Sequence, residues 1–440
     1  MSNENKRIYL VRSTNEDNNA FVGVRISNDS IEFHYPESYD LSGLDGVSTI
    51  KNLKEFRRDM IDILHTISLA KTRSSSIQKT ADGISSTKSF AFMSYLWVIR
   101  DYITNGMYRN AEKVYKNNAK GKVNWKRTLS TRPIISNGNV IYNNLVVEMN
   151  NECDTIITDA HRLCVYDSVR KVGWLFGINE KAFYVPTPTN NLLKKYINTI
   201  KDEMKRTFDD AKKMRLIHML KVLSGIDDSK KVAEIVYGVD KYNYVYERMI
   251  DAIFSNIVDI KKYNPNASWY ITKGNSTFEK KDASSLRPDT LRIEPYPKTY
   301  IFDDTTKTAY VLDAKFYRFG TTGNRDDLPE TTSVQKQITY ATHIKTNIRK
   351  EEKIERIHNA FVLPYNKNNN VFGFDNNLEY IGFSKANWVD QPNDSVVHAF
   401  LIDTKHLISS WSQGNCKDDI SKLISDIEEY VAKHESWQFI

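Results

Sequence analysis

The spacing of apolar and polar positions changes several times in the first part of the chain. Residues 7–35 alternate apolar and polar side chains, which predicts short strands. Over residues 53–70 the apolar positions recur at helical spacing, and a strongly apolar run at residues 90–103 predicts a second helix. Residues 72–89, between the two helices, are rich in serine, threonine and glycine, which indicates a linker or a mobile loop.

Helical and strand patterns alternate in the rest of the chain. Residues 190–222 predict a long helical region of mixed charge, and a polar break follows at residues 225–231. Beyond the break come a helix, strands, further helices and strands, and a C-terminal helix at about residues 418–432. That order predicts a mixed α/β domain of roughly 200 residues.

These patterns predict three regions. The first, residues 1–72, is small and mainly β. The second, residues 90–225, is mainly helical and basic. The third, residues 232–440, is the α/β domain.

Composition and charge narrow the class of protein. The chain has 440 residues, of which 40% are hydrophobic and 27% charged, as in soluble globular proteins. Its net charge of +7 favours a polyanionic partner. The start lacks the apolar run of a secretory signal, and residues 90–99 are too few for the ~20 that a membrane span needs. Three scattered cysteines suit neither a disulfide framework nor a zinc site. We therefore expect a cytoplasmic protein with no membrane contact.

One segment combines basic and aromatic side chains. Residues 113–128 contain six lysines or arginines and no acid, together with Tyr115 and Trp125. Such a segment suits nucleic acid, because the cations release counterions from phosphates and the rings pack against sugars or bases. An ordinary solvated loop with a buried tryptophan is the alternative. The candidate DNA-binding residues here are Lys120, Lys122, Trp125, Lys126 and Arg127.

Candidate chemistry gathers between residues 287 and 317. Two β-prone runs, residues 300–302 and 309–316, flank a polar turn and predict a hairpin. Alternate residues of a strand share a face, so Asp313 and Lys315 point the same way, ~7 Å apart along the strand. Asp289, just before the hairpin, supplies a second carboxylate.

Two carboxylates and a lysine at the end of a sheet suit phosphodiester hydrolysis. Carboxylate oxygens hold Mg²⁺, for which Mn²⁺ is expected to substitute, and the metal lowers the pKa of a bound water. Lys315 could orient or deprotonate that water, or stabilise the transition state. Glu247 borders the apolar stripe of a helix at residues 246–257 and is the candidate third carboxylate and metal ligand, beside Asp289 and Asp313. The alternative for Glu247 is a surface acid paired with a lysine.

The Asp-x-Lys pattern alone is weak, because the chain also contains it starting at Asp210, Asp228 and Asp403. The first lies in a helical stretch and the second in a polar break. Asp403 follows a strand at residues 396–402 but is better placed to cap the next helix. None has a Pro-Asp upstream, so the context selects Asp313.

Arg287-Pro288-Asp289 and Asp313-Ala314-Lys315 resemble the two half-motifs of the PD-(D/E)xK nuclease superfamily, and Glu247 matches its acid on the first core helix. The resemblance implies an α/β, restriction-endonuclease-like C-terminal domain with a mixed central sheet flanked by helices, preceded by an α+β N-terminal region. Residues 359–364 and 396–402 would supply the remaining core strands.

A predicted helix at residues 333–340 carries Lys336, Gln337 and Tyr340, and Lys336 and Tyr340 are expected to share one face. Similar positions in relatives lie beside the active site and contact the DNA backbone. The alternative is an ordinary polar helix face.

Within the superfamily the chain most resembles the LlaJI-type restriction endonucleases, relatives of McrC. The resemblance spans roughly residues 115–365 and rests on the motifs above, on Lys-Gln-x-x-Tyr and on residues 121–128. It implies a Mg²⁺-dependent type II enzyme that cuts double-stranded DNA at a specific site for phage defence, with a cognate methyltransferase protecting the host. It also implies either a homodimer or a partnership with an McrB-like nucleotide-hydrolysing subunit.

Other functions remain open at this point. The chain could be the nuclease subunit of an McrBC-like complex, an inactive DNA-binding subunit, or a repair or mobile-element nuclease of the same superfamily. The intact Asp289, Asp313 and Lys315 argue against inactivity. The first ~100 residues match no known motif, and only their position suggests a role in recognising DNA sequence.

Overall fold

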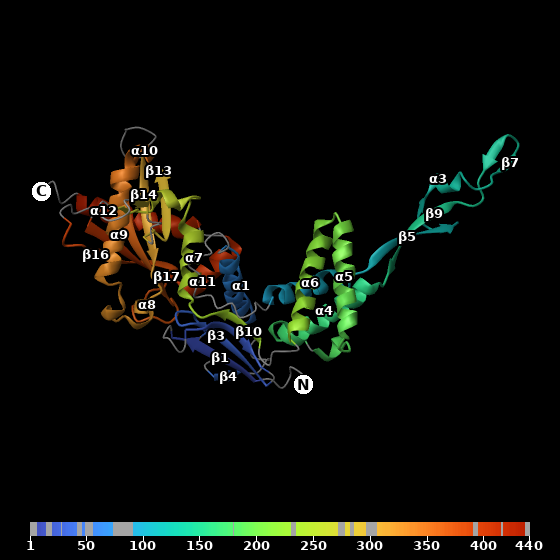
Figure 1. The fold of residues 1–440 in the computed structure, drawn as a ribbon, viewed down its shortest axis with the longest axis horizontal. Helices are drawn as coiled ribbons and strands as arrows, with labels where there is room; N and C mark the ends of the chain where they lie inside the picture. Colours follow the sequence, from blue (N-terminus) through green and yellow to red (C-terminus); the bar gives the residue numbers. More distant parts are fainter. Residues whose placement is uncertain are drawn as a thin grey trace. The chain divides into compact units, whose positions relative to one another are not determined.

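The chain forms two compact units (Figure 1). As far as its residues are described, the helical unit comprises residues 88–235 together with residues 26–29, and the sheet unit comprises residues 7–25, 30–87 and 236–440. The described residues of the predicted N-terminal region thus fall mostly in the same unit as the C-terminal domain. The computed structural model describes residues 7–14, 20–27, 29–41, 46–48, 56–73, 91–178, 180–229, 235–271, 278–281, 286–295, 306–389, 395–414 and 417–435.

The sheet unit contains an N-terminal sheet with the strand order β10-β2-β3-β1-β4. Its strands are β1 (Arg7–Ser13), β2 (Val22–Ile26), β3 (Ser30–Pro36), β4 (Gly46–Ser48) and β10 (Ile235–Val239). Gly23, at φ +150°, lets β2 approach β10, because a Cβ there would lie 2.3 Å from the carbonyl oxygen of Tyr237. The strand β10 therefore joins this sheet from a distant part of the sequence. Helix α1 (Arg57–Arg73) packs against α7 (Asn243–Phe254) and α11 (Thr404–Gln413).

The central sheet is mixed, as expected, with the strand order β13-β14-β15-β17-β16. Its strands are β13 (Thr290–Pro295), β14 (Lys307–Ala314), β15 (Ile354–Tyr365), β16 (Leu378–Lys385) and β17 (Val396–Asp403). The strands β14, β15 and β17 are parallel, and β13 and β16 pair antiparallel at the edges. The hairpin partner of β14 is β13, whereas the predicted strand at residues 300–302 lies outside the described residues.

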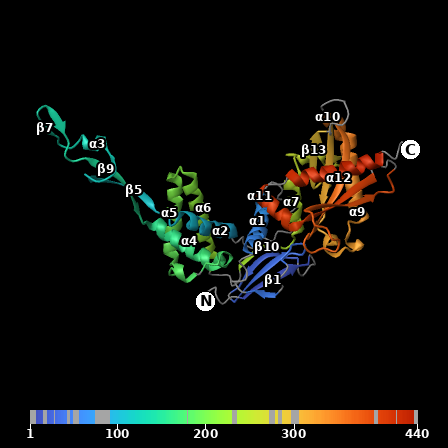
Figure 2. The same ribbon diagram turned by 180° about the vertical axis from the view of Figure 1, so that it is seen from behind.

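Helices cover both faces of this sheet (Figures 1 and 2). On one face, Val334 and Ile338 of α9 (Thr331–His343) pack against Phe361 and Leu363 of β15. On the other face, α12 (Lys417–Glu435) packs against β16, and the hydroxyl of Tyr246 in α7 donates to the carbonyl oxygen of Val362 at 3.3 Å. The unit also contains α8 (Phe319–Thr322), α10 (Arg349–Glu352), β11 (Ser268–Ile271) and β12 (Phe278–Lys281).

The helical unit is built from four packed helices, namely α2 (Phe92–Asn105), α4 (Ile156–Val172), α5 (Asn190–Arg206) and α6 (Asp210–Ser229). The long helix expected at residues 190–222 is two helices, because the Asp209 carboxylate accepts a hydrogen bond from the Ala211 amide and starts a new helix. The helix α6 continues to Ser229, so residues 225–229 of the predicted polar break are helical, and its last two residues lie outside the described residues. None of the helices in the described part of the chain is long and apolar enough to cross a membrane.

An arm, residues 110–153, leads away from these helices to a hairpin tip (Figure 1). Its elements are β5 (Asn110–Asn117), β6 (Lys122–Val123), α3 (Trp125–Thr128), β7 (Ile134–Ser136), β8 (Asn139–Ile141) and β9 (Val146–Cys153). The strand β9 pairs with β5 and β6, and the tip turns at Asn137 and Gly138, both at positive φ. The basic segment is therefore folded as strand, turn and short helix, and the alternative of an ordinary loop is wrong.

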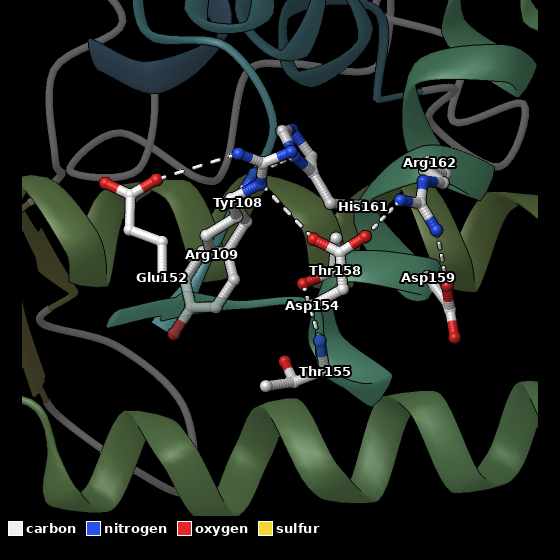
Figure 3. A network of polar contacts seen from close by, with 9 residues as sticks. All are labelled: Tyr108, Arg109, Glu152, Asp154, Thr155, Thr158, Asp159, His161 and Arg162. Atoms are coloured by element: carbon white, nitrogen blue, oxygen red, sulfur yellow. Dashed lines mark hydrogen bonds and ion pairs between the residues drawn. The ribbon is translucent and has the colours of Figure 1, made fainter. Parts of the chain in front are cut away.

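Polar contacts join the base of the arm to α4 (Figure 3). The Tyr108 amide donates to Nδ1 of His161 at 2.9 Å, and Arg109 pairs with Asp154 at 3.2 Å. Asp154 also pairs with Arg162 of α4. These contacts attach β5 and β9 to the start of the helix.

Candidate active site

The register of β13 and β14 places two acidic residues side by side. Thr290 pairs with Leu312, so Asp289 and Asp313 lie one position further along each strand and face each other. The Asp313 side chain is buried, and the two carboxyl groups lie within hydrogen-bonding reach. Asp289 is therefore a direct neighbour of Asp313 across the sheet edge.

Lys315 completes the cluster just beyond the end of β14. Its amide donates to the carbonyl oxygen of Val362 at 2.9 Å, which extends the pairing with β15. Its Nζ lies 2.8 Å from Oδ2 of Asp313. Burial alone would lower the pKa of Lys315, but the carboxylates of Asp313 and Asp289 outweigh it and the net pKa is raised.

Burial and neighbouring carboxyl groups raise the pKa of Asp289. The pKa of Asp289 lies well above its usual value, because the group is buried and because it shares a hydrogen bond with Asp313 and faces the charges of Asp313 and Glu247. Two adjacent buried carboxylates repel each other when both are ionised, so the pair favours a proton or a cation between them.

Glu247, on α7, belongs to the same cluster. Burial, followed by the charge of Asp313, raises its pKa, and Lys315 and Arg287 act in the opposite direction. Within the described residues Glu247 forms no ion pair. The alternative of a surface acid paired with a lysine therefore does not describe this side chain.

Asp289 and Asp313 fit a divalent cation, because they bring two hard oxygen donors to one buried point where positive charge would relieve their repulsion. No group of three His, Cys, Asp or Glu side chains is arranged as a metal site in the described part of the chain. Glu247 is thus near the carboxylate pair without converging on it, and one carboxylate oxygen of Asp313 contacts Lys315.

The residues predicted on α9 lie in different surroundings. Lys336 is exposed, whereas Gln337 is 0% and Tyr340 5% exposed. Tyr340 packs with Ala309 and Val311, so it does not share an exposed face with Lys336. Burial and the nearby charges of Asp313 and Asp289 raise the pKa of Tyr340. The tyrosine therefore lies beside the carboxylate pair, inside the protein, and its contact with DNA stays a prediction.

The basic residues of the arm are exposed. Lys120, Lys122 and Lys126 are open to solvent, and Trp125 is 60% exposed, so the alternative of a buried tryptophan is wrong. The Arg127 guanidinium lies 3.5 Å from the centre of the Tyr115 ring. These residues belong to the helical unit, whereas the carboxylate cluster belongs to the sheet unit.

The competing Asp-x-Lys patterns have structural roles. Asp210 begins α6, and Lys212 pairs with Glu203. The Asp403 carboxylate accepts a hydrogen bond from the His406 amide and caps α11, as expected. In the pattern that starts at Asp228, Lys230 lies outside the described residues.

Sequence reasoning missed the basic residues that line a cavity beside Asp289, namely Lys71, Lys241 and Arg248. Arg248 could have been found from the sequence, because it follows Glu247 directly and lies on the polar side of a predicted helix. No local pattern could have found Lys71, which reaches the cavity only through the packing of α1 on α7.

Residues 21–404 match the profile of the LlaJI restriction endonuclease family. The chain belongs to this family. It is therefore a restriction endonuclease, and the family assignment made from its motifs is confirmed. No curated protein matches the chain significantly.

Two solved structures are similar to the chain at low sequence identity. A chain in a half-complex from a tetradecameric assembly of Thermococcus gammatolerans McrB AAA+ hexamers with bound McrC matches with 12% identity and a TM-score of 0.35, covering 90% of this chain and 81% of that one. A chain in the Thermococcus gammatolerans McrBC complex matches with 13% identity and a TM-score of 0.21, covering 52% of this chain and 64% of that one.

Proposed function

We propose that this family member is a Mg²⁺-dependent type II enzyme that hydrolyses phosphodiester bonds of double-stranded DNA at a specific site. It would act in the cytoplasm within a restriction–modification system, beside a methyltransferase that protects host DNA. The observation that carries the proposal is the buried cluster of Asp289, Asp313 and Lys315 at the end of β14.

Each residue of the cluster has a task in this reaction. Asp289 and Asp313 would hold the cation, and Glu247 would contribute through a water molecule. When bound, Mg²⁺ lowers the pKa of a water molecule and offsets the negative charge of the phosphate. Lys315 brings a positive charge beside Asp313, where it can bind a phosphate oxygen or orient the attacking water. The low exposure of Asp313 restricts access of bulk water to this point.

The experiment is incubation of the purified chain with unmethylated phage DNA and Mg²⁺, with and without the products of neighbouring genes. Discrete fragments are the expected result, with no fragments after chelation of the metal and activity restored by Mg²⁺ or Mn²⁺. Asp313→Asn is the matched control for a contaminating nuclease. Intact DNA under every condition would refute the proposal.

A second candidate is the nuclease subunit of a complex with an McrB-like nucleotide-hydrolysing partner. The arm favours it, because Ile134, Ile135, Val140 and Ile141 at the tip are all exposed, and exposed apolar clusters mark protein interfaces. Cleavage that requires the partner and its nucleotide would support this candidate, and cleavage by the chain alone would refute it. The sequence resemblance also allows a homodimer. Measuring the oligomeric state of the purified chain tests that possibility.

A further inference from the structure

A cavity of about 240 Å³ lies beside the carboxylate cluster within the sheet unit. It is bounded by the end of α1, the segment after β10, one face of α7, and the Arg287-Pro288-Asp289 motif. Its charged lining residues are Lys71, Lys241, Glu247, Arg248, Asp251, Arg287 and Asp289. Two of the three acids, Glu247 and Asp289, belong to the cluster itself, so the lining beyond the cluster is mainly basic.

The basic residues of this cavity form no direct ion pairs. Within the described residues, Lys71, Lys241, Arg248 and Arg287 form no ion pair with a carboxylate. Other partly buried cations of the chain do, for example Arg215 with Asp101 and Lys212 with Glu203. Lys71, Arg248 and Arg287 are partly buried, whereas Lys241 is exposed. Unpaired cations that are partly removed from water are costly, so these three around one cavity favour an anionic ligand.

Lys71 shows this cost most clearly. Its ammonium donates to the carbonyl oxygen of Gly238 at 2.9 Å and lies 4.9 Å from the centre of the Tyr237 ring. These contacts hold the side chain in place without neutralising it. Burial lowers the pKa of Lys71, and the charge of Asp240 only partly offsets this. A phosphate in the cavity would supply the missing negative charge.

One side of the lining is a row of residues along α7. Tyr244, Arg248, Asp251 and Ser255 lie on one face of α7 and just beyond its end, at intervals of three or four residues. At 1.5 Å per residue these positions extend over ~16 Å. That length corresponds to roughly four or five nucleotides at ~3.4 Å each along a duplex strand. Arg248 of this row follows Glu247 directly, so a strand lying along the row would pass beside the carboxylate cluster.

We infer that Lys71 and Arg248, with Lys241 and Arg287, bind backbone phosphates of the cleaved strand beside the scissile phosphate. The inference rests on the proposed function and adds a substrate path to it. Lys71 and Arg248 are positioning residues, which hold the strand in register with Asp289 and Asp313. Helix α1, from the N-terminal region, would then contribute directly to DNA binding at the nuclease site.

The test is the salt dependence of DNA binding by the full-length chain, measured without divalent cations so that no cleavage occurs. The probe is a fluorescein-labelled duplex of mixed sequence, followed by anisotropy over a series of KCl concentrations. Lys71→Met and Arg248→Gln are each expected to reduce the slope of log K against log salt by ~0.9, the contribution of one phosphate contact. Arg58→Gln removes the same charge from an exposed position on α1, outside the cavity, and should leave the slope unchanged.

The outcomes separate the inference from the proposed function. If the wild-type chain binds and cleaves DNA while both cavity variants keep the wild-type slope, the inference is wrong and the proposed function stands. If the wild-type chain neither binds nor cleaves DNA, both are wrong. Thermal unfolding reports whether each variant folds. Should Lys71→Met unfold because Gly238 loses its donor, Arg248→Gln and Lys241→Gln decide the question.

Discussion

The ammonium of Lys315 lies 2.8 Å from Oδ2 of Asp313, the residue two positions before it, where β14 leaves the sheet. The pair is partly removed from water, and Asp289 faces Asp313 from the neighbouring strand. This arrangement holds a carboxylate and a cation at one point, as charge stabilisation during phosphodiester hydrolysis requires. Substitution of either residue should therefore reduce the rate of cleavage more than the affinity for DNA.

Asp313→Asn and Lys315→Ala should each abolish detectable cleavage and leave DNA affinity largely intact, because the chemistry and the backbone contacts are separate contributions. Cleavage assays with Mg²⁺ and anisotropy binding without it measure the two effects. The exposed Lys350→Ala on α10 is a matched control for loss of a lysine. Cutting by either site variant at the wild-type rate would contradict the assignment.

Glu247→Ala should reduce cleavage less, by about 10- to 100-fold, as expected for a group that acts on the metal through water. Its carboxyl group is near Asp313 but does not converge with the pair as a third ligand. Single-turnover rates at saturating DNA measure the effect. A wild-type rate would leave Glu247 without a role in the reaction, and complete loss would place it among the direct ligands.

Gln337→Leu should leave the free energy of unfolding unchanged or raise it, while reducing cleavage. Neither polar atom of the Gln337 amide has a hydrogen-bond partner within the described residues, so an apolar replacement of similar size loses no bond in the folded protein. The reduced cleavage is expected because Gln337 lies on the same helix as Tyr340, and its buried amide would form its hydrogen bonds only when substrate is bound. Thermal unfolding and cleavage assays test this, with the exposed Gln335→Leu on the same helix as the control. A strongly destabilised variant would show that the amide already has a structural partner.

Replacing Lys120, Lys122, Lys126 and Arg127 together by alanine should flatten the salt dependence of DNA binding by up to ~4 units of slope, ~0.9 for each phosphate contact. The expectation follows from their exposure on the arm. Affinity should fall similarly for all DNA sequences, because phosphate contacts carry no sequence information. An unchanged slope would indicate that this surface of the arm meets a protein partner or solvent.

The helical unit should lose stability as the pH falls from about 6.5 towards 4. Burial, aided by the charge of Arg215, lowers the pKa of His161 to about 4 in the folded protein. The unfolded chain then binds more protons in this window, so the free energy of unfolding decreases with decreasing pH, by at most about 3 kcal/mol for this group. Thermal unfolding across the window measures the loss. His161→Gln, which keeps an acceptor for the Tyr108 amide, should make the pH dependence shallower. An equally steep dependence would exclude His161 as the cause.

The sequence by itself determined the local parts of the candidate site. A strand has a side-chain period of two, so Asp313 and Lys315 had to point to the same side of the sheet. The structure places Nζ of Lys315 2.8 Å from Oδ2 of Asp313. The apolar stripe of α7 likewise fixed the side of the helix that enters the core. Both features depend on neighbours within a few residues, which is the range over which a pattern carries information.

The tertiary structure decided everything that depends on long-range pairing. The pairing of β13 with β14 brings Asp289 opposite Asp313, and no local pattern selected residues 290–295 as the partner of β14. Packing decided that Tyr340 is buried although Lys336, one turn earlier, is exposed. It also brought Lys71 to a cavity beside Asp289, because α1 packs on α7. Such contacts arise from burying apolar surfaces of segments far apart in the chain, and no local spacing of residues records which surfaces will meet.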